Sequence, residues 1–296
     1  TLDYLLKKEQ IPLPSSRRSW NQSILIKKAK ENNLKNIDVE IPLGIMTVVT
    51  GVSGSGKSTL IKKILYPSLG KILGLNTGAT GKFAKLDGDY QKINHIEFID
   101  QNPIGKSSRS NPVTYVKAYD HIRQLFSEQP ISIKNRFKPA FFSFNVIGGR
   151  CDTCEGEGTV KIEMQFMADI HLTCDSCKGQ RFKKEILEVC YQQKNINEIL
   201  NLTVSEALIF FSDKKNIYNK IKPLDDVGLG YVKLGQSSSS LSGGEAQRVK
   251  LASFLSKKGG NKNDHTLFLF DEPTTGLHFH DIEKLLNSIN ALINER

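Results

Sequence analysis

The chain has 296 residues, which allows roughly one to three domains with buried cores. Hydrophobic residues make up 39% and charged residues 24%, and no apolar run approaches the roughly 18 residues that span a bilayer, so the composition excludes a membrane-spanning chain and a wholly disordered one. The formal charge of +10 suits a polyanionic partner, although an excess of this size is also common in proteins that simply stay soluble.

No basic-then-apolar leader follows Thr1, so we expect no secretory signal and a cytoplasmic location. Residues 1–20 contain two prolines and a Ser-Ser-Arg-Arg cluster, and we expect them to form an interdomain linker. From Ser23 onward the pattern becomes β-like. Strands are predicted over residues 24–26, 37–41 and 46–50.

A phosphate-binding loop is predicted between the third strand and a helix over residues 60–66. The sequence Gly51-Val-Ser-Gly-Ser-Gly-Lys-Ser58 fits the pattern G-x-x-x-x-G-K-[ST], although a lone match has false positives. Its glycines let backbone N–H groups turn toward phosphates at a helix N-terminus, whose partial positive charge favours anions. Lys57 adds a full charge at the β- and γ-phosphates, and Ser58 should hold Mg²⁺. The candidate nucleotide-binding residues of the loop are Gly51, Ser53, Gly54, Ser55, Gly56, Lys57, Ser58 and Thr59.

A polar, glycine-rich loop is predicted over residues 70–92, followed by a strand over 95–99 that delivers Asp100 and Gln101 to the same end of the sheet. From Gln101 to Leu241 the chain is far longer than one helical lobe requires, so we expect an inserted second domain. Within it we predict a helix over 113–129, a strand over 142–146, a hairpin over 159–170, and a helix over 207–211 after the capping box Thr203-Val-Ser-Glu206.

Two C-x-x-C pairs lie inside this insertion, Cys151 with Cys154 and Cys174 with Cys177. Their spacing is typical of a structural zinc site. Two disulfides and a redox pair are the alternatives, but a reducing cytosol and the doubled pattern favour zinc. A glycine stands two residues after each pair and permits the positive φ that points N–H groups at the sulfurs. The fifth cysteine, Cys190, lies in a strand-like run over 186–191 and is expected to be buried.

The segment Leu241-Ser-Gly-Gly-Glu-Ala-Gln-Arg248 precedes a helix predicted over residues 245–255. Ser242, Gly243 and Gly244 would open that helix and create a second N-terminus able to bind an anion. A helix cap rich in small residues is the alternative interpretation.

Asp271 ends a fully apolar run and should orient the Mg²⁺ shell, and Glu272 is the candidate base for the attacking water. A core-facing helix is predicted next, because apolar residues repeat at helical spacing at Ile282, Leu285, Leu286, Ile289, Leu292 and Ile293.

The phosphate loop, the Leu-Ser-Gly-Gly-Glu segment and the Asp-Glu pair, in this order, identify the chain as a member of the ABC-type ATPases. That resemblance implies that Gln101 senses Mg²⁺ and the attacking water, with a surface amide as the alternative. It also implies that Ser242, Gly243 and Gly244 face the γ-phosphate of a nucleotide held by a second cassette. We therefore expect an α/β fold, an ABC-type P-loop ATPase core with an inserted α+β signature domain carrying a zinc module. The expected bounds are 21–101 and 240–296 for the core, 102–239 for the insertion and 145–184 for the zinc module. The core would end before a further strand and a switch histidine.

The chain resembles, nearly end to end, the second ATP-binding half of the A subunit of the bacterial UvrABC excinuclease. The motifs that carry this resemblance are Glu31-Asn-Asn-Leu-Lys-Asn36, Gly51-Val-Ser-Gly-Ser-Gly-Lys-Ser58, Asp100-Gln-Asn-Pro-Ile-Gly105, Arg109-Ser-Asn-Pro112, Phe142-Ser-Phe-Asn145, Gly148-Gly-Arg-Cys151, Asp226-Val-Gly-Leu-Gly-Tyr231, Leu241-Ser-Gly-Gly-Glu-Ala-Gln-Arg-Val-Lys250 and Asp271-Glu-Pro-Thr-Thr-Gly-Leu-His278.

This resemblance implies a DNA-damage sensor of nucleotide excision repair that needs ATP, Mg²⁺ and Zn²⁺. The implied partners are duplex DNA, a second ABC cassette and the B subunit of the excinuclease, with no membrane partner. The second cassette would be the first half of the same protein, and the protein would also form a homodimer. The first half and the domain that binds the B subunit lie outside this sequence. A piece of this kind is expected to bind ATP or ADP and to hydrolyse ATP very slowly.

The resemblance also places the zinc module near the DNA, where a cationic face would neutralise phosphates. The basic residues around the module are Arg136, Lys138, Arg150, Lys161, Lys178, Arg181, Lys183 and Lys184. For any single lysine, simple solvation is the stronger alternative. The phenylalanines among them, which we expect in the core of a small domain rather than stacked on bases, are Phe141, Phe142, Phe144 and Phe166.

Three other functions share parts of this pattern. A transporter ATPase subunit has the same nucleotide motifs, but the zinc insertion argues against it. A resistance or self-protection ATPase related to the same A subunit would carry all the motifs, so the sequence does not exclude it. A non-enzymatic zinc-ribbon module would leave the ATP motifs unexplained.

Overall fold

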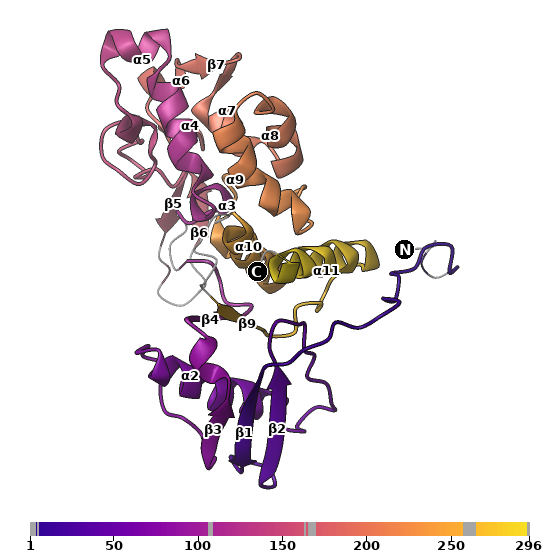
Figure 1. The fold of residues 1–296 in the computed structure, drawn as a ribbon. Coiled ribbons are helices and arrows are strands. Elements are labelled where there is room, and N and C mark those ends of the chain that lie inside the picture. Colours follow the sequence, from indigo (N-terminus) through magenta and orange to yellow (C-terminus); the bar gives the residue numbers. More distant parts are fainter. Residues whose placement is uncertain are drawn as a thin grey trace. The chain divides into compact units, whose positions relative to one another are not determined.

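The computed structural model describes residues 4, 6–105, 109–162, 164, 170–256 and 265–294. It separates into two compact units, one of Thr1–Asp100 with Lys258–Arg296 and one of Gln101–Lys257. Figure 1 shows the elements of each unit. We call residues 241–248 the signature segment and the helix that it opens the signature helix. By its contacts this helix belongs to the second unit, whereas the sequence placed it in the core. The predicted domain bounds stay a prediction.

The first unit contains an antiparallel sheet in the order β2-β1-β3, formed by β1 (Ser23–Ala29), β2 (Ile37–Pro42) and β3 (Lys85–Gly88). Leu25 of the central strand pairs with Glu40 of β2 and with Asp87 of β3. The strands predicted over 24–26 and 37–41 are confirmed. The loop predicted over 70–92 is wrong in part, because β3 completes the sheet there by pairing with β1, a contact that the polar local sequence does not signal.

Two parallel strands, β4 (His95–Ile99) and β9 (Thr266–Phe270), form a second sheet in this unit. Ile99 pairs with Phe270, and the backbone N–H of Asp271 donates to the carbonyl oxygen of Ile99 at 3.2 Å. The strand predicted over 95–99 is confirmed. Because the strands are parallel and in register, the residues that follow them leave the sheet at the same edge.

Helical segments make up the rest of the described elements of this unit. They are η1 (Thr59–Leu65), wound as a π-helix, α2 (Tyr66–Ile72), the short η2 (Tyr90–Lys92) and α11 (Phe279–Asn294). The core joins Ile24 and Ile26 of β1 to Ile64 of η1, Ile96 of β4 and Leu269 of β9. On α11 the buried members of the predicted apolar stripe are Leu285, Ile289 and Leu292, which confirms the helix and its inward face.

The strand predicted over 46–50 is wrong. These residues form no strand, and Val48 is 69% exposed. A strand needs a neighbour to accept and donate its backbone hydrogen bonds, and none of the strands in the described part of the chain pairs with this segment. Its apolar sequence satisfies the local pattern for a strand but supplies no partner.

The second unit is mainly helical. Its elements are α3 (Pro112–Tyr115), α4 (Ala118–Ser127), α5 (Pro130–Asn135), η3 (Pro139–Phe142), β5 (Thr159–Ile162), β6 (Ile170–Thr173), α6 (Lys184–Leu187), β7 (Cys190–Tyr191), β8 (Lys194–Asn195), α7 (Ile196–Asn201), α8 (Val204–Phe210), α9 (Lys215–Asp226), η4 (Ser238–Ser240) and α10 (Gly243–Leu255). The predicted hairpin is confirmed, since β5 pairs with β6 antiparallel. The predicted capping box is confirmed at the start of α8, where Thr203 and Glu206 exchange hydrogen bonds with each other's backbone N–H groups.

Three predictions for this unit need correction. The helix over 113–129 is two helices, α3 and α4, because Lys117 between them adopts a left-handed conformation with φ of 60°. The strand over 142–146 is wrong, because Phe142, Ser143 and Phe144 are all buried and leave no solvent face for an alternating strand. The strand-like run over 186–191 is also wrong: it begins inside α6, and Cys190 in the two-residue strand β7 is exposed.

Candidate nucleotide and metal sites

The phosphate loop has the left-handed backbone that its glycines permit. Gly54 has φ of 78° and Gly56 has φ of 101°. A Cβ at Gly56 would lie 2.7 Å from Cδ2 of Leu34, so a larger residue there would force the Leu34 side chain to move. The Nζ of Lys57 donates to the carbonyl oxygens of Gly51 at 2.7 Å and Val52 at 2.8 Å. The lysine of the loop is therefore folded back onto the loop's own backbone.

A second segment frames this loop. The side-chain amide of Asn33 donates to the carbonyl oxygen of Gly54, and that of Asn32 donates to Oγ1 of Thr59 at 3.2 Å. Leu34 packs under Gly56. These roles were not assigned from the sequence. The signal was the Glu31-Asn-Asn-Leu-Lys-Asn36 segment, whose polar residues have no apolar pattern of their own.

Asp271 and Glu272 follow β9 directly. The carboxylate of Asp271 pairs with Nζ of Lys62 at 2.6 Å, a contact that was also missing from the sequence reasoning. Glu272 is exposed and has φ of 46°, a left-handed conformation that is uncommon for a residue with a side chain and that clusters at functional sites. Its carboxylate accepts a hydrogen bond from Oγ1 of Thr275 at 3.3 Å.

One cavity of about 570 Å³ connects these residues within the first unit. Lys57, Ser58, Asp271 and Glu272 line its polar part, and the unpaired segment 45–49, β9 and α11 supply apolar walls. Ser58 supplies a hydroxyl and Asp271 a carboxylate to this cavity. Mg²⁺ prefers oxygen ligands and is usually bound by one or two carboxylates together with substrate phosphates. The residues present thus fit a magnesium nucleotide.

The signature segment forms a capped helix start in the second unit. Ser242 is the N-cap of α10: its Oγ accepts from the backbone N–H of Glu245 at 3.3 Å, while its own N–H donates to the carboxylate of Glu245 at 2.8 Å. Tyr231 donates its hydroxyl proton to that carboxylate at 2.6 Å. Although burial opposes it, these hydrogen bonds lower the pKa of Glu245. The capping box therefore stays formed at neutral pH.

Arg248 joins this helix to the preceding loop. It is only 5% exposed, and its guanidinium donates to the carbonyl oxygen of Gly228 at 3.0 Å and to the hydroxyl of Tyr231 at 3.3 Å. Arg248 is therefore a structural anchor rather than an exposed phosphate ligand.

Gln101 lies beside the same helix start. A Cβ at Gly243 would come within 3.0 Å of Cβ of Gln101 and 3.3 Å of its Oε1, so the two residues are in close contact and a larger residue at 243 would press on the glutamine. The predicted site residues thus fall into two sets. The first unit holds the phosphate loop with Asp271 and Glu272, and the second holds Gln101 with Ser242, Gly243 and Gly244.

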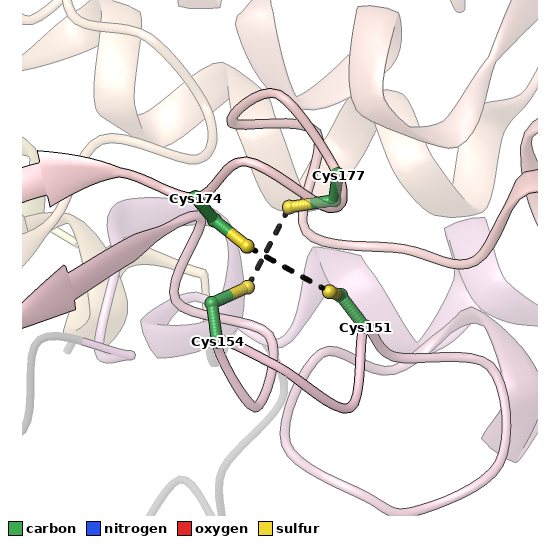
Figure 2. A group of neighbouring side chains, drawn as sticks. All are labelled: Cys151, Cys154, Cys174 and Cys177. Carbon is green, nitrogen blue, oxygen red and sulfur yellow. Dashed lines mark hydrogen bonds between the residues drawn. The ribbon is translucent and has the colours of Figure 1, made fainter.

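The four paired cysteines form a cluster that could hold a metal ion (Figure 2). Their Sγ atoms all lie within 4.8 Å of one another, with 4.0 Å between Cys151 and Cys174 and 3.6 Å between Cys154 and Cys177. Four sulfurs at the usual Zn–S distance in a tetrahedron stand about 3.8 Å apart. All four side chains are buried and none forms a disulfide.

The two loops that carry the cysteines have the same backbone conformation. Positive φ angles occur at the first, second and fourth positions after each pair, namely Glu155, Gly156 and Gly158, and Lys178, Gly179 and Arg181. The predicted role of the two glycines is confirmed, with φ of 86° at Gly156 and 82° at Gly179. The hydroxyls of Thr153 and Ser176, at matching positions, hydrogen-bond at 2.8 Å.

The thiols of the cluster differ in acidity. The backbone N–H of Cys177 lowers the pKa of Cys174 to about 7, whereas burial raises the pKa of Cys177 to about 12. The N–H of Gly158 donates to Sγ of Cys154 at 3.2 Å and favours its thiolate, although burial raises its pKa overall. N–H groups that face the sulfurs are the arrangement that supports thiolate ligands.

The basic residues around the cluster do not form one uniform face. Arg181 packs over the ring of Phe144 and donates to the carbonyl oxygen of Gly235 at 3.2 Å, and Arg150 and Lys183 pair with Glu155 and Asp152. The exposed members are Arg136, Lys138, Lys161, Lys178 and Lys184. Core positions are confirmed for Phe142 and Phe144, both fully buried, whereas Phe166 lies outside the described residues.

The chain is similar to known proteins over most of its length. The family model described as ABC transporter matches residues 144–275, which include the signature segment and Asp271 with Glu272. The UvrABC system protein A of Clostridium perfringens is 51% identical over 292 residues, 98% of this chain and 31% of the relative. That of Borreliella burgdorferi is 50% identical over 295 residues, 99% of this chain and 31% of the relative.

Among solved structures, UvrA2 from Deinococcus radiodurans matches with a TM-score of 0.88 and 42% identity, over 99% of this chain and 34% of that one. The chain thus spans about a third of the length of the relatives it matches. Within the described ranges, no helix has the length and apolar character to cross a membrane.

Proposed function

Because this chain belongs to the UvrA family over nearly its whole length, we propose that it is an ATP-binding part of a protein that recognises DNA damage in nucleotide excision repair. The observation that carries this proposal is the cavity shared by Lys57, Ser58, Asp271 and Glu272. It combines an anion-binding loop, oxygen ligands for a divalent cation and an exposed carboxylate in one place.

We propose the following division of roles at the nucleotide. The backbone of residues 51–59 holds the phosphates, and Lys57 leaves the carbonyls of Gly51 and Val52 to meet their charge. Ser58 and Asp271 hold Mg²⁺, which neutralises phosphate charge when bound. Glu272, exposed at the cavity, takes the proton of the attacking water.

The second set of residues acts on a nucleotide of another cassette. The Oγ of Ser242 accepts the N–H of Glu245 as a cap, so its own proton is free to be donated to a γ-phosphate. Gly243 and Gly244 add N–H groups at the start of a 13-residue helix. Gln101, beside Gly243, would position water at the assembled site. Assembly with a first cassette and as a homodimer is part of this proposal.

The cysteine cluster holds one structural zinc ion. Four thiolates leave no open position for water, so the metal stabilises the fold of the second unit rather than taking part in hydrolysis. The guanidinium of Arg181 donates a hydrogen bond to the carbonyl oxygen of Gly235. The carbonyl oxygen of the same arginine accepts the N–H of Cys151 at 2.8 Å. Arg181 therefore links the zinc module to the segment before the signature helix.

Duplex DNA is the proposed polyanionic partner, with the B subunit of the excinuclease as the protein that acts next. The formal charge of +10 and the exposed lysines and arginine beside the zinc module support DNA binding through phosphates. A damage sensor of this kind would recognise shape and deformability rather than base edges.

Equilibrium binding of a fluorescent ATP analogue with Mg²⁺ tests the nucleotide half of the proposal. The wild-type chain should bind it, and Lys57→Ala should abolish binding because the loop loses its only full charge on the phosphates. Lys63→Ala, which removes an exposed lysine of the next helix, is the matched control and should bind normally. Equal binding by all three proteins would reject the proposed site.

A further inference from the structure

Lys62 forms an ion pair that the motifs do not require. Its Nζ lies 2.6 Å from Oδ2 of Asp271, a residue 209 positions away in the sequence. The two side chains are 41% and 31% exposed, so each is partly shielded from water. Asp271 is also the carboxylate to which the proposed function assigns the Mg²⁺ shell.

The position of Lys62 is held from a second side. Its ammonium lies 5.6 Å from the centroid of the Phe98 ring, and Phe98 in turn contacts Tyr66 with ring centroids 5.2 Å apart. Phe98 belongs to β4, the strand paired with β9, which ends just before Asp271. A lysine over an aromatic face and against a carboxylate has two attractions that favour one location.

The backbone around Lys62 is unusual as well. The helix that follows the phosphate loop is wound as a π-helix over Thr59–Leu65, with the N–H of Tyr66 donating to the carbonyl oxygen of Ile61. Such winding is rare and occurs frequently at functional sites. Lys62 lies within this segment, four residues after Ser58, and both line the same cavity with Asp271.

We propose that Lys62 is a built-in counter-ion of Asp271 that competes with the divalent cation and so sets the Mg²⁺ concentration that nucleotide binding requires. This inference rests on the proposed function. An ammonium within 2.6 Å of Oδ2 occupies one ligand oxygen and places a positive charge where a cation would approach. Binding of Mg²⁺ must therefore displace Lys62 from that oxygen.

The lysine of the phosphate loop, Lys57, is also held by groups of the protein itself. Lys57 is satisfied by the carbonyl oxygens of Gly51 and Val52, while Lys62 is satisfied by Asp271. Two of the lysines that line the cavity, Lys57 and Lys62, thus have partners within the protein. Binding of nucleotide and Mg²⁺ would have to break the contacts of Lys57 with the loop carbonyls and the contact of Lys62 with Asp271. Only the contact with Asp271 depends on Lys62.

The test compares Lys62→Gln with Lys63→Gln, an adjacent exposed lysine whose replacement removes the same charge. The half-saturating Mg²⁺ concentration is measured for binding of a fluorescent ADP analogue. Lys62→Gln should lower it by about two- to fivefold, the range expected for loss of a partly exposed ion pair, and Lys62→Arg should restore the wild-type value. Lys63→Gln should leave it nearly unchanged.

A second measurement needs no bound nucleotide. Thermal unfolding in EDTA is compared for wild type, Lys62→Gln, Asp271→Asn and the double variant. If the pair forms, the changes in unfolding temperature caused by the two single substitutions should not add up in the double variant, because each substitution alone already removes the interaction. Direct binding of Mn²⁺, followed by electron paramagnetic resonance, should be tighter in Lys62→Gln than in Lys63→Gln.

The outcomes separate the two proposals. If the wild-type chain binds the nucleotide but Lys62→Gln and Lys63→Gln have the same Mg²⁺ requirement, the counter-ion role is rejected and the proposed function stands. A higher Mg²⁺ requirement in Lys62→Gln would also reject it. If the wild-type chain binds no nucleotide, the proposed function is rejected, and this inference with it.

Discussion

The Sγ atoms of Cys154 and Cys177 lie 3.6 Å apart, one from each of two loops with the same backbone conformation. A disulfide would place two sulfurs about 2.05 Å apart, so this distance excludes a disulfide and is compatible with two ligands around a common centre. The matched positive φ angles at Gly156 and Gly179 and the hydrogen bond between Thr153 and Ser176 hold the loops face to face. The four cysteines could therefore hold a metal ion.

We predict one zinc ion per chain in protein purified without chelator, measured by plasma mass spectrometry. Cys174→Ser should lose the metal and lower the stability of the second unit, because three thiolates no longer close the site. The control is Cys190→Ser, since Cys190 is exposed and outside the cluster. Metal-free wild-type protein, or a disulfide between Cys151 and Cys154, would contradict the zinc site.

Glu272→Gln is expected to keep ATP bound and to block turnover in the complete protein. The amide preserves the size of the side chain but cannot accept the proton of water, so only the chemical step is lost. Single-turnover measurements with radiolabelled ATP separate binding from hydrolysis. Normal turnover by this variant would show that another group is the base.

The signature serine is predicted to act in two ways that can be separated. Ser242→Ala should destabilise α10 by about 1 kcal/mol through loss of the cap, and it should also slow turnover. Thr203→Ala removes the equivalent cap of α8 and should cost about as much stability without changing turnover, which makes it the control.

Ser242→Arg should impair turnover at the site of the opposite cassette while nucleotide binding at Lys57 stays intact. The chain by itself should hydrolyse ATP very slowly, because its signature segment needs a second phosphate loop. Robust turnover that is linear in protein concentration at high dilution would reject this action on another cassette.

The capping box of α8 should also make stability depend on pH. The N–H and the hydroxyl of Thr203 donate to Glu206 and lower its pKa. A lowered pKa in the folded state means that the stabilisation is present above the unfolded pKa of about 4.3 and is lost as pH falls through the folded value. The difference in unfolding free energy between wild type and Glu206→Gln should thus shrink below about pH 4. A difference that is constant from pH 7 to pH 3 would contradict this.

Local chemistry explains what the sequence predicted well. The capping box at Thr203 and the hairpin β5–β6 each depend on residues close together in the chain. The cysteine cluster was predictable for the same reason, since each C-x-x-C pair determines the turn around its own sulfurs.

The predictions that were wrong, and the contacts that were not predicted, depend on residues far away in the sequence. Residues 46–50 have the composition of a strand but gain no neighbour to satisfy their backbone. The burial of Phe142 through Phe144 follows from helices that pack around them, and the strand β3 forms because β1 lies beside it. The contact of Lys62 with Asp271 joins residues 209 positions apart, which no local pattern indicates.

The most direct test of the central claim is DNA binding measured by fluorescence anisotropy. A duplex with one bulky lesion and the same duplex without it are titrated with the chain at two salt concentrations, with ATP, a non-hydrolysable analogue or no nucleotide. The account predicts binding that weakens with salt, prefers the lesion and responds to nucleotide in wild type, while Lys57→Ala loses the response to nucleotide. Binding that is indifferent to both lesion and nucleotide, or no binding at low salt, would contradict it.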